Sequence, residues 1–183
     1  MDHDYTEAPL RRICQYAGLV VNVKVDEVRL HDGTTSLREV VEHPGGVAVL
    51  PVDDEGYAYC VRQYRYPFRE HFIEAPAGKL EPGEDPKDCA IRELSEETGF
   101  TAGRLVDLGY ICASPGFSNE VLYLYLALDL TAGRPHLDRG EFLDVLRLPL
   151  TELMTRIMAG EVCDGKTVAA ALKAAKFLDI GEK

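Results

Sequence analysis

The sequence predicts a mixed α/β (α+β) domain with more strand than helix, preceded by a small module of antiparallel strands. The alternation Val-Asn-Val-Lys-Val-Asp over Val21–Asp26 is typical of a half-buried strand, and a second strand is expected at Ser36–Val41. The run His43-Pro44-Gly45-Gly46 then breaks the pattern. We therefore expect an N-terminal strand module over residues 1–43 and a main domain over residues 44–183.

The main domain combines apolar strand segments with helical segments. An Asp-Asp-Glu-Gly turn between its first two strands predicts a hairpin, whereas residues 1–18 are poorly periodic and receive no element. We expect strands at Val47–Val52, Tyr57–Tyr64, Phe72–Ala75, Leu105–Cys112, Val121–Leu128 and Phe142–Leu148, and helices at Pro86–Thr98, Thr151–Ala159 and Lys166–Leu178.

Composition narrows the class of protein. A formal net charge of −11 disfavours nucleic acid as a partner, because duplex binding depends on basic residues that displace counterions. No apolar stretch approaches the roughly 18 residues of a membrane span, and the N-terminus does not resemble a signal peptide. The five scattered cysteines form no CxxC pair and are expected to be small buried hydrophobes. We expect a cytoplasmic protein that contacts neither nucleic acid nor membrane.

Acidic side chains gather on one predicted helix. Asp85-Pro86 is typical of a helix start and Gly99 of a helix end, so the helix runs about 13 residues. Glu93 and Glu97 stand four residues apart and share a face.

Three carboxylates on one arc of this helix, including Glu96, destabilise it unless a cation neutralises them. Hard oxygen ligands favour Mg²⁺, with Mn²⁺ as a possible substitute. Arg92, four residues before Glu96, is placed to hold it. The alternative is an ordinary solvated acidic face, which is the usual fate of a charge run.

The spacing of the acids favours the cation site over a solvated acidic face, because it resembles a family signature. The segment Gly78–Phe100 is similar to the signature of the Nudix hydrolase superfamily. It reads Gly78, five residues, Glu84, seven residues, and then Arg92-Glu93-apolar-x-Glu96-Glu97-x-Gly99-apolar. Further segments resemble its ADP-ribose pyrophosphatase branch, and the likeness covers roughly residues 38–178. These segments are Val61–Pro67, Glu74–Glu84, Ser114–Glu120 and Asp164-Gly165-Lys166-Thr167. The resemblance implies the Nudix fold, a mixed β-sheet sandwiched between helices.

The resemblance also implies site residues. As metal ligands it suggests the carboxylates of Glu93 and Glu97 and the main-chain carbonyl of Ala77. Glu84 and Glu96 would complete the acidic site, and Arg92 would orient it. Glu141 would bind metal from a later loop. Arg65 falls where the family places a phosphate-contacting arginine. Further candidates for substrate contact are Arg38, Glu74 and the turn Pro115-Gly116, which is otherwise an ordinary turn.

The general base departs from the family pattern. Relatives often carry two glutamates two residues apart before the last core strand, but here Arg139 stands in place of the first. An arginine stays protonated and cannot accept a proton from water. Glu141 is the first candidate for the base, Glu120 the second, and Asp138 a third.

The resemblance implies hydrolysis of ADP-ribose to AMP and ribose 5-phosphate. Two alternatives remain open: a Nudix hydrolase of another nucleotide sugar or dinucleotide, and an inactive nucleotide-binding regulator. A homodimer is expected, with residues about 10–42 forming strands that pack on, or exchange with, the partner, because the strand at Val21–Asp26 needs a partner edge. The resemblance implies the same, since the family commonly dimerises through such a module and builds part of its adenosine site there.

Overall fold

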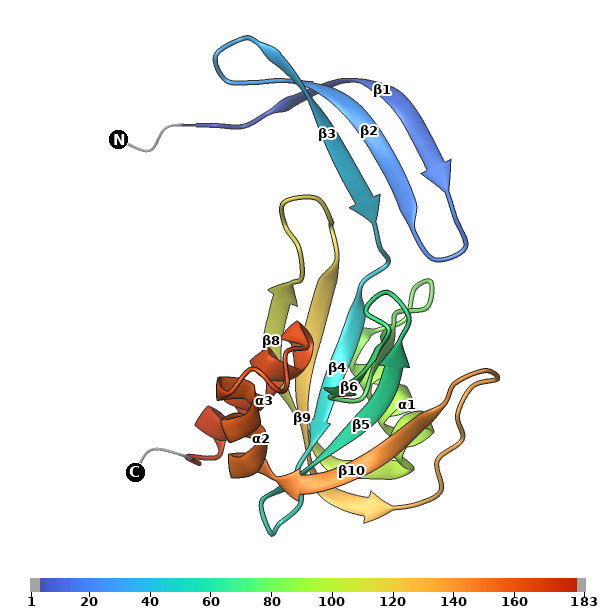
Figure 1. Cartoon of the computed structure of the whole chain (residues 1–183), viewed down its shortest axis with the longest axis vertical. Coiled ribbons are helices and arrows are strands. Elements are labelled where there is room, and N and C mark those ends of the chain that lie inside the picture. Colours follow the sequence, from blue (N-terminus) through green and yellow to red (C-terminus); the bar gives the residue numbers. More distant parts are fainter. Residues whose placement is uncertain (1–3, 181–183) are drawn as a thin grey trace. The chain divides into compact units, whose positions relative to one another are not determined.

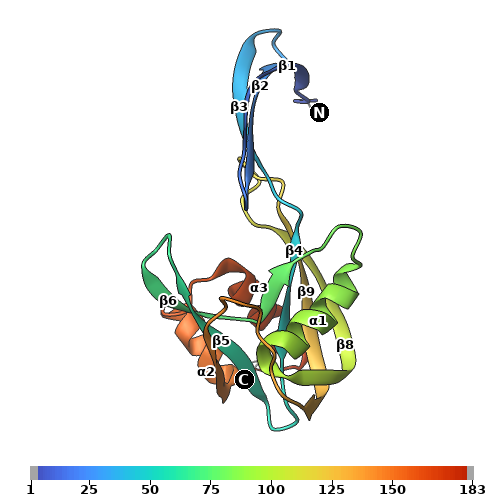
Figure 2. The same ribbon diagram turned by 90° about the vertical axis from the view of Figure 1, so that its right-hand side faces the viewer.

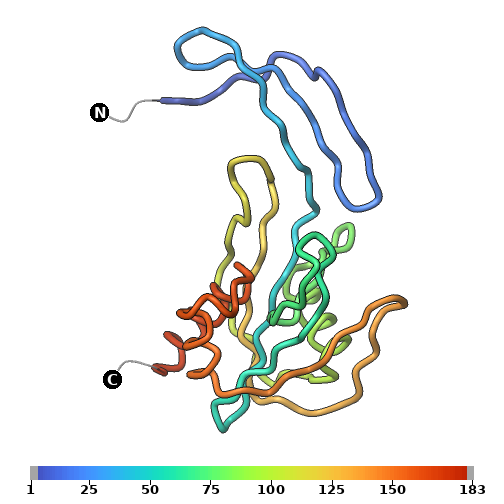
Figure 3. Tube along the Cα trace, in the orientation of Figure 1, coloured from blue at the N-terminus to red at the C-terminus, as the bar shows by residue number. Residues whose placement is uncertain are grey.

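The computed structural model describes residues 4–180 of the chain, which divides into two compact units. The first comprises Met1–Gly45 with Cys112–Glu120, and the second comprises Gly46–Ile111 with Val121–Lys183. Figures 1 and 3 trace the chain through both units. Within residues 4–180, no helix is long and apolar enough to cross a membrane.

The first unit contains a three-stranded antiparallel sheet in the order β1-β2-β3. Its strands are β1 (Ala8–Ala17), β2 (Asn22–Arg29) and β3 (Thr35–Glu42), so the strands expected at Val21–Asp26 and Ser36–Val41 are confirmed. From the sequence no helix or strand is expected in residues 1–18, and the presence of β1 shows that this expectation is wrong. All residues of β1 are exposed, and two register irregularities interrupt its pairing with β2, so the strand carries no apolar alternation to detect.

Residues 112–120 belong to this unit through backbone contacts with the end of β3. The N–H of Val41 donates to the carbonyl of Phe117 at 2.7 Å, and the N–H of His43 donates to the side chain of Asn119 at 2.8 Å. The Ser114-Pro115-Gly116 segment therefore forms a turn of the first unit, although it lies far from β3 in the sequence.

The second unit is built on a mixed sheet in the order β7-β4-β9-β8. Its central strands β4 (Gly46–Pro51) and β9 (Val121–Ala132) run parallel, while β7 (Ala77–Lys79) is antiparallel to β4. β8 (Phe100–Cys112) completes the sheet and begins five residues earlier than expected. The short strand β7 was not anticipated.

A second, antiparallel sheet has the order β10-β5-β6, with β5 (Tyr57–Arg65) between β6 (Glu70–Glu74) and β10 (Leu143–Pro149). The predicted hairpin between β4 and β5 is wrong. The turn exists, but the two strands are joined by only one bridge, Val52 to Ala58, before they enter different sheets.

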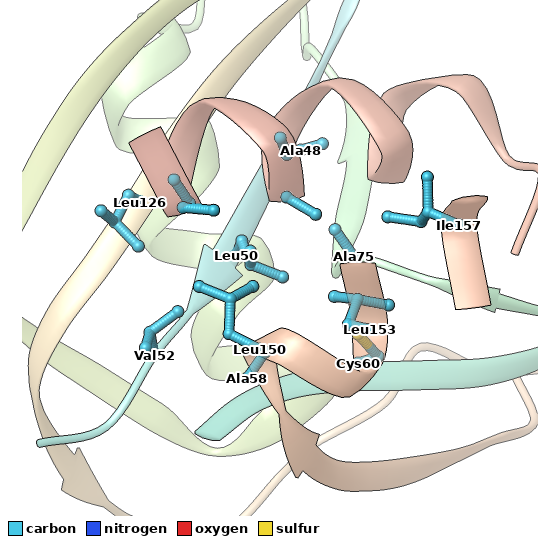
Figure 4. Packing of buried hydrophobic residues seen from close by; sticks show 14 of the residues in the cluster. Ala48, Leu50, Val52, Ala58, Cys60, Ala75, Leu126, Leu150, Leu153 and Ile157 are labelled. Atoms are coloured by element: carbon cyan, nitrogen blue, oxygen red, sulfur yellow. The ribbon is translucent and has the colours of Figure 1, made fainter. Parts of the chain in front are cut away.

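Three helices complete the unit: α1 (Pro86–Thr98), α2 (Leu150–Met158) and α3 (Gly165–Phe177). The bounds of α1 are confirmed as predicted, and those of α2 and α3 lie within one residue of expectation. Alternate residues of the fully buried strand β4 face opposite sides. Ala48 and Leu50 pack with α2 and α3 (Figure 4), and Val47 and Val49 pack with α1. The mixed sheet thus lies between helices, which confirms the predicted fold (Figure 2).

All five cysteines are free thiols. Cys60 and Cys89 are buried, and burial raises the pKa of each thiol to about 12. Cys14, Cys112 and Cys163 are exposed, so the expectation of buried hydrophobes is wrong for these three.

Candidate active site

Local signals at both ends hold the acidic helix α1 in place. The side chain of Asp85 caps the first turn, and Pro86 occupies the position where a missing N–H costs nothing. At the other end Gly99 adopts a φ of 74° and its N–H donates to the carbonyl of Ser95 at 2.9 Å. These caps fix the direction in which the carboxylates of the helix point.

Arg92 is the hydrogen-bonding centre of the acidic cluster. Its Nε and Nη2 donate to the two carboxylate oxygens of Glu84 at 2.9 and 3.0 Å, and its Nη1 donates to Glu93 at 2.6 Å and to Glu96 at 3.1 Å. These bonds lower the pKa of Glu84 to about 2. One guanidinium therefore aligns three of the predicted acids, including the expected contact with Glu96.

Gly78 brings β7 against the carboxylate of Glu93. A Cβ at position 78 would lie 1.7 Å from Oε1 of Glu93 and 2.0 Å from its Cδ. A side chain fits there only if the Glu93 carboxylate moves away, so glycine serves here for close approach rather than for backbone freedom. The first and the fourth specified positions of the signature, Gly78 and Glu93, are thus in direct contact.

Glu97 is the most deeply buried acid of the cluster, with 4% of its surface exposed. Its Oε2 accepts a hydrogen bond from the N–H of Ala77 at 3.1 Å. Burial raises its pKa to about 8; the Ala77 N–H opposes this shift, and the charges of Glu93 and Glu141 reinforce it. Burial also raises the pKa of Glu93. Negative charge on these two acids is therefore poorly compensated by the protein itself.

A divalent cation fits this donor set. Among residues 4–180 no three acidic, histidine or cysteine side chains converge as a ready-made cage, and Glu97 forms no ion pair there. Mg²⁺-type ions are commonly held by one or two carboxylates, with water and substrate phosphates completing the shell. The carboxylates of Glu93 and Glu97, which lie on one face of α1, would supply that number of hard oxygen ligands.

Glu141 approaches the cluster from the loop before β10. It is half-buried, its side chain accepts from the N–H of Asp138 at 3.3 Å, and its charge raises the pKa of both Glu93 and Glu97. Arg139 is exposed. The loop is fastened to the acidic helix upstream, where the N–H of His136 donates to the carbonyl of Glu96 at 2.9 Å.

A second cluster of charges lies beside Glu97. Arg65 donates to both oxygens of Glu74 at 2.6 and 2.7 Å, and the ammonium of Lys166 also contacts Glu74. Burial of Glu74 acts to raise its pKa, but Arg65 and Lys166 outweigh it and hold the pKa below its usual range. Glu74 is only 2% exposed and both its oxygens are engaged, so its carboxylate orients Arg65.

The remaining predicted residues lie in the first unit. Arg38 donates to the side chain of Glu7 and to the carbonyl of Leu37, and Pro115 and Gly116 form an exposed turn. The carboxylate of Glu120 lies 3.3 Å from Nδ1 of His43. The acidic cluster, by contrast, comes entirely from the second unit.

Comparison with known proteins matches this arrangement to a family. The model of the NUDIX domain matches residues 42–172. Over 157 residues, 85% of each chain, the protein is 42% identical to an ADP-ribose pyrophosphatase of Bacillus subtilis (strain 168). It is 43% identical, over the same length and coverage, to a methanol dehydrogenase activator of Bacillus methanolicus. A solved structure of an ADP compounds hydrolase shares the fold, with a TM-score of 0.82 and 21% identity over 97% of both chains.

The chain therefore belongs to the Nudix family of hydrolases, which generally use divalent metal ions. Its family signature, Gly78 to Phe100, is the segment that forms β7, the following turn and the acidic helix.

Sequence reasoning assigned no role to Lys166 and its neighbours, which the structure brings to the site. The capping pattern of Asp164 and Thr167 is visible in the sequence as a helix start. Nothing local indicates the ion pair between Lys166 and Glu74, because the two residues are 92 positions apart.

Proposed function

We propose that this protein hydrolyses the diphosphate of ADP-ribose to AMP and ribose 5-phosphate in the presence of Mg²⁺, with Mn²⁺ as a substitute. The observation that supports it best is the pairing of two clusters in one unit. Glu93 and Glu97 form an undercompensated acidic cluster, and the arginine of the Arg65–Glu74 pair lies beside it. The acids suit a cation and the arginine suits a phosphate oxygen.

Glu93, Glu97 and the carbonyl of Ala77 would hold the cation, which supplies Lewis-acid stabilisation and lowers the pKa of bound water. Glu84 and Glu96 share Arg92 with Glu93 and keep its carboxylate aligned. Arg65, held in a bidentate pair by Glu74, presents the rest of its guanidinium to a phosphate of the diphosphate.

For the general base we favour Glu141, because its charge acts on both Glu93 and Glu97. Glu120 and Asp138 are the alternatives. The test compares Glu141→Gln, Glu120→Gln and Asp138→Asn at saturating Mg²⁺ over a range of pH. The variant of the base should lose kcat and the acidic limb of the pH profile while keeping its affinity for Mg²⁺. Rescue of Glu141→Gln by excess Mg²⁺ would make Glu141 a ligand only.

A substrate panel tests the reaction itself. Purified protein with Mg²⁺ is given ADP-ribose, GDP-linked and ADP-linked hexoses and diadenosine polyphosphates, and the release of AMP and GMP is followed. We expect the highest kcat/KM for ADP-ribose. A higher value for a hexose conjugate would favour the first alternative, and no Mg²⁺-dependent product from any substrate would favour an inactive nucleotide-binding regulator.

We also propose a cytoplasmic homodimer in which the first unit contributes to the interface and to the adenosine site. Support comes from its composition: β1 carries the exposed apolar residues Leu10, Ile13 and Tyr16, and Val28 is the only buried hydrophobic residue among the described residues of β1–β3. A three-stranded sheet with so little buried surface gains stability by covering one face or edge. Arg38 and the Pro115-Gly116 turn remain candidates for substrate contact within this unit.

A further inference from the structure

The start of α3 contacts the strand segment that leads into the family signature. Asp164, Lys166 and Thr167 are called here the α3 anchor: Lys166 contacts Glu74, Thr167 contacts Ala75, and Asp164 contacts both Lys166 and Thr167. These contacts join positions 92 residues apart. None of the three anchor residues belongs to the signature between Gly78 and Phe100.

Thr167 makes the central contact of the α3 anchor. It is fully buried, and its hydroxyl accepts from the N–H of Ala75 at 2.7 Å while it donates to Asp164 Oδ2 at 2.5 Å. Asp164 also caps α3 by accepting from the N–H of Thr167 at 3.0 Å. One hydroxyl therefore satisfies a buried backbone donor, and removing the hydroxyl takes that partner away from the N–H of Ala75.

Lys166 makes the second contact. Its ammonium contacts Glu74 and lies 3.0 Å from Oδ1 of Asp164, and only 11% of its side chain is exposed. Glu74 in turn holds Arg65 through two hydrogen bonds. The orientation of Arg65 thus depends on a carboxylate that Lys166 shares.

The next two residues are fixed as well. The N–H of Val49 donates to the carbonyl of Pro76 at 2.8 Å, and the N–H of Ala77 donates to Glu97 at 3.1 Å. Each residue from Glu74 to Ala77 is therefore held by a specific polar contact, and the first two are held by the α3 anchor. A displacement of the backbone at Ala75 is therefore transmitted to Ala77.

We infer that Thr167 and Lys166 are positioning residues, which set the backbone of Ala77 and the guanidinium of Arg65 for cation and phosphate binding. The inference rests on the proposed function, because it takes Ala77 and Arg65 as binding groups. Partners that orient metal ligands without touching the metal commonly change metal affinity 10- to 100-fold when they are removed.

The test measures Mn²⁺ binding by electron paramagnetic resonance without substrate, and kcat and KM for ADP-ribose separately. Thr167→Val removes the hydroxyl at nearly constant shape and should raise the Mn²⁺ Kd at least about tenfold, whereas Thr167→Ser should stay within about threefold of the native protein. Lys166→Gln should raise KM several-fold, and Lys166→Arg should restore it. The matched controls are Thr155→Val on α2, whose hydroxyl bonds only its own helix, and Lys173→Gln on α3, whose ammonium contacts the carbonyl of Leu108.

An unchanged Mn²⁺ Kd and KM in Thr167→Val and Lys166→Gln would overturn the inference, and so would equal shifts in the two controls. If Thr167→Val does not fold, the contrast between Lys166→Gln and Lys166→Arg decides the matter through KM. The Mn²⁺ measurement needs no substrate. Failure of the native protein to release AMP from ADP-ribose would therefore refute the proposed function and leave the effect of Thr167 on the cation site to be judged separately.

Discussion

Gly78→Ala is the most direct perturbation of the proposed cation site, because it adds one methyl group where the Glu93 carboxylate lies. The new Cβ would lie 1.7 Å from Oε1 of Glu93, and separations under 3.0 Å are essentially never adopted. The carboxylate must therefore move by at least 3.0 − 1.7 = 1.3 Å. Because the obstacle is the end of a flexible side chain, we expect Glu93 to move and the fold to persist.

That displacement is large compared with the tolerance of a cation site. Mg²⁺ holds its oxygen ligands at roughly 2.0–2.1 Å in near-octahedral geometry, so a shift above 1 Å removes Glu93 as a ligand. A misplacement of this size costs on the order of 10²-fold in rate. We expect kcat for ADP-ribose to fall by about that factor and the Mg²⁺ concentration for half-maximal activity to rise at least about tenfold.

The assay follows AMP release at a series of Mg²⁺ concentrations for Gly78→Ala, Glu93→Ala and the double variant, with thermal unfolding in EDTA as the folding control. Once Glu93 is shortened, the three atoms nearest to the added methyl are gone, so the double variant should be no worse than Glu93→Ala alone. A Mg²⁺ dependence of Gly78→Ala within twofold of the native protein, or strictly additive losses, would refute the reasoning.

Four further outcomes are expected. Glu97→Gln should lower kcat at least about 10²-fold with the fold intact, and near-native turnover at saturating Mg²⁺ would exclude Glu97 as a ligand. In metal-free protein the pKa of Glu97 is about 8 in the folded state, against a reference value of 4.5. Ionisation of Glu97 therefore favours the unfolded chain. The stabilising contribution of Glu97 is therefore complete below pH 4.5 and is lost as the pH rises through about 8, by up to a few kcal/mol. Urea unfolding in EDTA at pH 5 and pH 9 should show this slope for the native protein and a flatter one for Glu97→Gln; parallel slopes would contradict it. Arg92→Lys should lower activity, because a lysine cannot hold Glu84 through two parallel bonds while also reaching Glu93; full activity at ordinary Mg²⁺ would argue against an aligning role. Light scattering should give a dimer, and a fully active monomer would disprove the proposed role of residues 10–42.

The elements whose signals are local were predictable from the sequence. The limits of α1 follow from Asp85, Pro86 and Gly99, which act within one turn of the helix ends. The chemistry of the signature was equally accessible, because the spacing of Glu93, Glu96 and Glu97 converts directly into a shared helical face.

Features that depend on distant partners were not predictable. β1 is exposed throughout, so its residues carry no pattern of burial. The turn after β4 looks like a hairpin turn, but the pairing of β4 with β9 and of β5 with β10 separates the two strands. The contact of Lys166 with Glu74 likewise arises only when α3 packs beside the sheet.

Two backbone contacts limit how far Glu141 can move relative to the proposed cation site. His136 is bonded to the end of the acidic helix, and Leu143 is paired with Gln63 in β5, so only residues 137–142 are free between two fixed points. A tether this short keeps the local concentration of the carboxylate high wherever the loop moves. The anchoring bond at His136 is made by a backbone N–H, so it does not depend on the side chains of the loop. Changes in loop length or in the identity of Arg139 can therefore alter the reach of the Glu141 carboxylate while the acidic helix α1 stays unaltered.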